Sequence, residues 1–168
     1  MSAPNTTKQS LQSPEAALRV LQIICAAMSM GLLTFGVIVA VIGDAEPPAD
    51  LFADPLPLIG AIFGSVCLAA SLFLPGVLTR QAVAKASAID DAWIAQHLVS
   101  TSIVGFALAE GGGLMNLVFW LLTGALVNPI IAGACLFAII ARFPTQGRLD
   151  AYRRWCEELH ANRATPLH

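Results

Sequence analysis

Charged residues divide the chain into long apolar windows. No Asp, Glu, Lys or Arg occurs within residues 20–43, 55–79, 92–109 or 111–141, which gives windows of 24, 25, 18 and 31 residues. A helix needs about 20 apolar residues to cross the hydrocarbon core of a bilayer. Only Glu110 separates the last two windows, and turn residues occur within the last of them, at 123–129. The pattern therefore predicts four membrane-spanning helices, over about residues 18–42, 56–78, 98–122 and 126–141.

Capping and breaking residues refine the ends of these helices. Asp90 or Asp91 is the expected N-cap of the helix that leads into the third span, because a carboxylate there can accept a hydrogen bond from a free backbone N–H. Pro75-Gly76 is expected to end or kink the second span, because proline removes a backbone donor from the helix interior. The fourth span is the shortest.

Composition supports a membrane location. The chain is 57% hydrophobic and 12% charged, whereas charged residues make up about a quarter of a typical soluble domain. We therefore expect an all-α protein, an integral membrane antiparallel four-helix bundle over residues 17–143. A polar N-terminal segment, 1–16, precedes this transmembrane domain, and the cytoplasmic tail, 144–168, is expected to begin with an amphipathic helix.

The distribution of basic residues predicts the orientation. Of the nine Lys and Arg residues, two lie near the N-terminus, two lie between the second and third spans, and five lie from Arg142 onward. With four crossings, all of these places share one side of the membrane. The positive-inside rule then puts both termini in the cytoplasm and the acidic stretch 44–54 outside.

Glu110 is the main candidate functional residue, because it stands near the middle of the third span. An ionised carboxylate at the centre of a membrane helix costs at least about 2.5 kcal/mol. Two interpretations remain open: a protonated structural group bonded to a neighbouring helix, or a site that binds or relays a proton or sodium ion. His97, Thr101 and Asn116 are its expected polar neighbours.

Small residues indicate close helix packing. His97, Thr101, Gly105, Ala109, Gly113 and Asn116 follow one another at helical spacing and form a small, polar stripe. Gly60 and Gly64 form a G-x-x-x-G motif in the second span. Such motifs let two helices approach closely, either within one chain or between two copies. Both alternatives stay open from the sequence.

The run Ala107-Leu108-Ala109-Glu110, followed by Leu117-Val118 and Leu121-Leu122, resembles the carboxylate-bearing helix of the c-type proteolipids of rotary ATPases. In that family the acid binds the translocated proton or sodium ion, a role that the resemblance would assign to Glu110. The glycine-repeat helix of the family is missing here. The four-span pattern with an Ala-Leu-x-Glu-Gly motif also resembles small uncharacterised bacterial membrane proteins, which implies a bacterial-type inner (cytoplasmic) membrane.

Catalytic patterns do not occur in the sequence. His97, His160 and His168 have no metal-ligand spacing with Glu or Cys, and no G-x-S-x-G, H-E-x-x-H or P-loop pattern is present. We expect no enzyme activity, catalytic residue, metal or cofactor, and at net charge −2 no nucleic-acid partner. The expected role is structural or accessory, through helix packing and assembly in the lipid bilayer with a second copy or other membrane subunits. The alternative is a proteolipid-like proton- or sodium-translocating subunit that uses Glu110.

Overall fold

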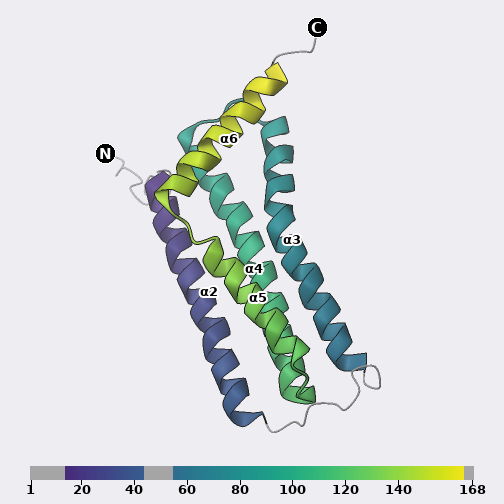
Figure 1. Cartoon of the computed structure of the whole chain (residues 1–168). Helices are drawn as coiled ribbons and strands as arrows, with labels where there is room; N and C mark the ends of the chain where they lie inside the picture. Colours follow the sequence, from purple (N-terminus) through teal and green to yellow (C-terminus); the bar gives the residue numbers. More distant parts are fainter. Residues whose placement is uncertain (1–13, 44–54, 165–168) are drawn as a thin grey trace, which may run out of the picture.

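The computed structural model describes residues 14–43 and 55–164. This part of the chain forms five helices and contains no strand: α2 (Pro14–Ile42), α3 (Pro55–Lys85), α4 (Asp91–Thr123), α5 (Val127–Ala141) and α6 (Gln146–Ala164). Most of the expected polar N-terminal segment, the acidic stretch 44–54 and the end of the tail lie outside the described residues. Consecutive helices from α2 to α5 run in alternating directions, and α6 crosses their upper ends (Figure 1).

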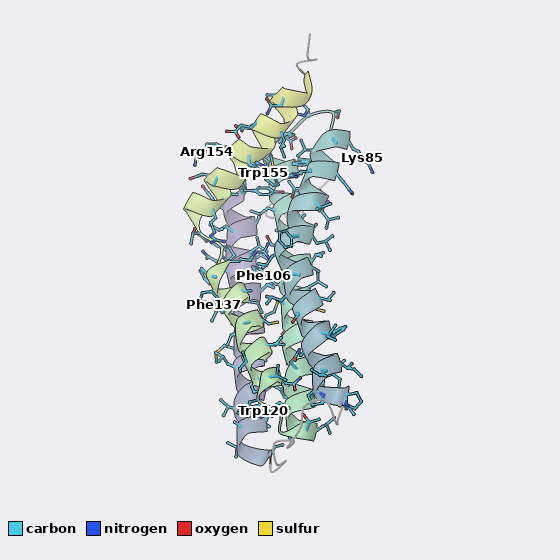
Figure 2. The ribbon with its side chains drawn as sticks, turned by 45° about the vertical axis from the view of Figure 1, so that its right-hand side comes forward. Lys85, Phe106, Trp120, Phe137, Arg154 and Trp155 are labelled. Carbon is cyan, nitrogen blue, oxygen red and sulfur yellow. The ribbon has the colours of Figure 1, made fainter. Side chains whose placement is uncertain are left out.

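The helices have the length and composition of membrane spans. α2, α3 and α4 are each long and apolar enough to cross a bilayer, and α5 and α6 qualify as a fourth span only as a pair bent by 81°. Large apolar side chains point outward from all of these spans, including Val41 (77% exposed), Phe73 (71%) and Phe137 (71%). Figure 2 shows Phe137 at the outer edge of α5, in contrast to Phe106 among the helices. Such a surface is typical of a membrane protein.

α4 is the central helix of the structure. It makes the largest contacts of the fold, with α3, α2 and α5. In Figure 1, α5 lies in front of α4, between α2 and α3. The apolar core is formed by α2, α4 and α5: Leu21, Cys25, Leu32, Val39, Phe106, Ala109, Leu117, Ala132 and Ile139.

Local capping sets both ends of α4, and its N-cap is one of the two residues that the sequence predicts. The Asp90 carboxylate accepts a hydrogen bond from the Trp93 backbone N–H at 2.7 Å. At the other end, Gly124 adopts φ 66°, and its N–H donates to the Trp120 carbonyl. A left-handed residue after a helix is most easily glycine, because glycine has no Cβ to clash. The short turn that follows leads directly into α5.

Of the two effects expected of Pro75-Gly76, an end or a kink of the second span, the end is wrong. α3 continues through both residues to Lys85, so this helix runs seven residues beyond the expected Leu78. Proline removes only one backbone donor, and the rest of the helix can persist when the freed carbonyl finds another partner. Here the carbonyl that Pro75 frees, that of Ser71, accepts a hydrogen bond from Arg142.

The tail forms α6, which packs on the ends of α3 and α2. Its residues Leu149 and Cys156 are buried, and the Tyr152 hydroxyl lies 3.2 Å from Thr79 Oγ1 of α3. The outer side of α6 carries an ion pair to α4, in which Arg153 Nη2 lies 2.5 Å from Asp91 Oδ1. An exposed pair of this kind contributes at most about 1 kcal/mol. The apolar face of α6 therefore carries most of its attachment.

Candidate functional site

Glu110 lies at the edge of the contact between α4 and α2. Its side chain is partly exposed, and its Oε1 is 3.6 Å from the position that a Cβ on Gly31 would occupy. The carboxylate has no hydrogen bond or ion pair with any residue in the described ranges. Gly111, the next residue, faces open space. Glu110 is thus accessible from the outer surface of the helices.

The three expected neighbours of Glu110 make their contacts elsewhere. Asn116 is fully buried and binds the Gly112 carbonyl at 2.8 Å. Thr101 Oγ1 donates to the His97 carbonyl at 2.8 Å, and the His97 ring stacks on Trp93 with 4.9 Å between centroids. Positions 110 and 116 differ by about 120° around a helix, because each residue turns about 100°. Glu110 therefore faces α2, away from the side of Asn116.

Asn116 instead belongs to a buried amide pair. Asn128 Nδ2 of α5 donates to Asn116 Oδ1 at 3.1 Å and to the Pro57 carbonyl of α3 at 3.2 Å. Asn128 Oδ1 is buried without a hydrogen-bond partner among the described residues. The pair joins α3, α4 and α5 at one depth, and hydrogen bonds of this kind between membrane helices contribute about 0.6 kcal/mol on average. We interpret the pair as part of the helix packing.

The small residues singled out in the sequence lie at helix contacts. Gly60 faces Phe119 and Asn128, and Gly64 faces Asn116 and Ile131, so both glycines of the G-x-x-x-G motif pack against α4 and α5 of the same chain. Gly105 approaches Pro75 of α3, Gly113 approaches Leu32 of α2, and Ala109 is buried. Their common property is that a larger side chain would separate the helices.

A cavity of about 380 Å³ lies between α6 and the upper parts of α2, α3 and α4. In Figure 2, Trp155 marks the level at which α6 crosses, and Phe106 lies deeper among the helices. Both residues line the cavity. Its apolar wall comprises Leu18, Leu21, Leu72, Pro75, Leu98, Phe106, Leu149 and Trp155, and its polar groups are Thr79, Thr101, Ser102, Arg142, Thr145, Arg148 and Tyr152.

Arg142 supplies the hydrogen bond that Pro75 removes from α3. In an uninterrupted helix, the N–H of residue 75 would donate to the carbonyl of residue 71. Because proline has no N–H, the Ser71 carbonyl is free, and Arg142 Nη1 donates to it. Gly105 leaves room for this contact, since a Cβ there would lie 3.2 Å from Arg142 Nη1. Arg142 therefore satisfies a deep backbone carbonyl on another helix.

Two positively charged side chains, Arg142 and Arg148, line the cavity. Arg148 Nη2 donates to the Ala141 carbonyl at 2.8 Å, and its charge repels that of Arg142. No Asp or Glu lines the cavity, and in the described part of the chain neither arginine forms an ion pair. The site has the chemistry of an anion-binding site beside an apolar wall.

The docking of α6 can be followed by titrating Tyr152, the only tyrosine of the chain. Burial raises the pKa of its hydroxyl above the ordinary value of about 10. The stabilisation associated with this shift is fully present below pH 10 and is lost as the pH rises through the higher folded pKa. We expect tyrosinate absorbance to appear at higher pH in the folded protein than in detergent-denatured protein. Equal titration midpoints would show that Tyr152 is in water and that α6 does not dock.

Sequence reasoning missed Arg142 and Arg148, and a signal for Arg142 was present. A proline inside the predicted second span leaves a carbonyl free, and an arginine directly follows the predicted fourth span, which is the shortest of the four. What the sequence lacks is the information that residues 71 and 142 lie at the same depth. Comparison with known proteins adds no further guide, because no family model, curated protein or solved structure matches this chain.

Proposed function

We propose that this chain is a four-span membrane protein of the inner (cytoplasmic) membrane with a structural or accessory role, rather than an enzyme. The observation that carries the proposal is the belt of exposed apolar side chains along α2, α3, α4 and α5. The buried amides of Asn116 and Asn128 support the structural role, because they bind other helices of the same chain. Its partners would be a second copy or other membrane subunits.

In the proposed arrangement, α2 to α5 form an antiparallel bundle and α6 lies on the cytoplasmic side. The basic residues favour this orientation, because Arg80, Lys85 and the arginines after Ala141 lie towards one end of the helices. Reporter fusions test it. Green fluorescent protein fused after His168 should fluoresce, and alkaline phosphatase inserted within residues 44–54 should be active. An active phosphatase fused after His168 would contradict the proposed orientation.

Ion translocation by Glu110 is the second candidate function. It is favoured by the position of the carboxylate, which lies near the middle of α4 and has no partner among the described residues. The carboxylate is also partly exposed on the outer surface of the helices. A translocating acid needs such access, whereas a structural acid is expected to bond to a neighbouring helix. Labelling of Glu110 by a hydrophobic carbodiimide, with protection by sodium, would support this candidate. Labelling that neither sodium nor pH affects would count against ion translocation by Glu110.

Replacing Glu110 by glutamine separates the structural role from the ion-handling role. Glutamine resembles a protonated glutamate in size and hydrogen bonding, so the two proteins should have equal thermal stability and oligomeric mass between about pH 5 and pH 9 if the acid is a neutral structural group. Thermal unfolding and light scattering in detergent measure both properties. A pH- or sodium-dependent change that occurs only in the wild type would instead show that Glu110 titrates or binds a cation.

A further inference from the structure

We propose that the cavity beneath α6 binds an anionic phospholipid of the cytoplasmic leaflet. The phosphate would lie beside Arg142 and Arg148, and part of an acyl chain would lie against the apolar wall of the cavity. This inference rests on the proposed membrane location, and it adds a ligand to the structural role.

The cavity exists because α5 is much shorter than its neighbours. The 15 residues of α5 cover about 22 Å, whereas the 33 residues of α4 cover about 50 Å. Beyond Ala141, therefore, no helix fills the space between α2 and α3 on this side of α4, and α6 covers it from above. The resulting volume of about 380 Å³ lies within the range of about 300–1,000 Å³ that small-molecule sites occupy.

The charges of the site favour an anion. A guanidinium has five N–H donors, and Arg142 uses one of them, on Nη1, for the Ser71 carbonyl. Its remaining donors have no acceptor within the described ranges. Arg148 also lines the cavity and adds a second positive charge, and no carboxylate lines it. A phosphate between the two arginines would receive charge-assisted hydrogen bonds and relieve their repulsion.

The rest of the lining favours a lipid over a soluble phosphate. Leucine, proline and aromatic side chains make up most of the wall, and a free phosphate would leave this apolar surface uncovered. Leu72, at the edge of the cavity, is 49% exposed, so the apolar wall is continuous with the outer surface of α3. In addition, α5 is shorter than the hydrocarbon core of about 30 Å. A bilayer thins locally around such a short helix, and this thinning would bring lipid headgroups closer to Arg142.

Trp155 lines the cavity and serves as the reporter. The test uses full-length protein with Trp93→Phe and Trp120→Phe, so that Trp155 is the only tryptophan. The protein is placed in nanodiscs of phosphatidylcholine that contain increasing fractions of brominated phosphatidylglycerol or, separately, brominated phosphatidylcholine. We expect quenching of Trp155 at a lower fraction of the anionic lipid. Equal quenching by the two brominated lipids would overturn the proposal.

Charge variants assign the preference to the cavity. A hydrogen bond to a charged group contributes about 1.5 kcal/mol or more, which corresponds to at least about a tenfold change in affinity, whereas general attraction to an anionic surface contributes about 1 kcal/mol per basic residue. Arg148→Gln should therefore weaken the preference for the anionic lipid at least about tenfold, and more than a variant that removes only surface attraction. Arg154→Gln is the matched control, because Arg154 is an exposed arginine of the same helix that does not line the cavity. An equal loss in both variants would show general surface attraction and overturn the proposal.

Two further measurements keep the result interpretable. Arg142→Lys keeps the charge and a donor for the Ser71 carbonyl, so the variant should fold. It loses the planar guanidinium that can bind a phosphate through two hydrogen bonds, so it should bind the anionic lipid more weakly than the wild type. Unchanged binding in both Arg142→Lys and Arg148→Gln would contradict the site.

Inorganic phosphate is titrated against the brominated lipid, and full competition by phosphate alone would assign the site to a soluble anion instead. Because nanodiscs present the same lipids on both faces, this test does not depend on the orientation that the fusions measure.

Discussion

Replacing Gly64 by alanine is expected to lower the free energy of unfolding by about 1–3 kcal/mol, the usual cost of overpacking a tight core. A Cβ on Gly64 would overlap Asn116 Nδ2 and lie 2.8 Å from Ile131 Cγ2. Asn116 cannot simply rotate away, because its amide binds the Gly112 carbonyl and accepts a hydrogen bond from Asn128. The substitution should therefore push α3 away from α4 and disrupt the buried amide pair.

A matched control in the same helix separates packing from helix propensity. A Cβ on Gly76 would meet nothing within 4 Å, so Gly76→Ala should be neutral or stabilising by up to about 1 kcal/mol. The adjacent pair in α4 should behave likewise: Gly112→Ala is destabilising, since its Cβ would lie 2.7 Å from Cys67 Cβ, whereas Gly111→Ala has open space. Denaturation in mixed micelles measures all four variants. Equal effects at Gly64 and Gly76 would show that α3 and α4 do not approach as described.

Replacing Arg142 by leucine should destabilise the protein by about 1–3 kcal/mol, the cost of leaving a buried backbone group without its partner. The group concerned is the Ser71 carbonyl, which Pro75 frees and Arg142 satisfies. Leucine keeps an apolar side chain at position 142 but offers no donor. Denaturation of the variant in mixed micelles, compared with the wild type, measures the loss.

A second substitution should rescue that loss. Alanine at position 75 restores a backbone N–H that can donate to the Ser71 carbonyl. In the Pro75→Ala background, Arg142→Leu should therefore cost less than it does in the wild type, and the double-mutant cycle should show a coupling energy of about 0.5–3 kcal/mol. The cycle also separates the structural role of Arg142 from its proposed role in lipid binding, because Pro75→Ala cannot replace the charge. Additive effects would show that Arg142 and Pro75 do not share the Ser71 carbonyl.

The sequence by itself determined the helices and most of their ends. The apolar windows predicted α5 to within one residue, 126–141 against Val127–Ala141, and the expected cap at Asp90 or Asp91 is Asp90. These features could be predicted because hydrophobic windows and capping depend on residues that are close together in the chain. The number of crossings and the role of Glu110 remain proposals.

Only the tertiary structure decided which polar groups meet. Asn116 pairs with Asn128 rather than with Glu110, and Arg153 of α6 pairs with Asp91 of α4. Arg142 meets the Ser71 carbonyl, 71 residues earlier in the chain, and this contact accompanies the continuation of α3 through Pro75. Each of these contacts depends on the relative depth and rotation of two packed helices. Hydrophobic periodicity does not specify either quantity, because apolar side chains can pack in many registers whereas a hydrogen bond requires one.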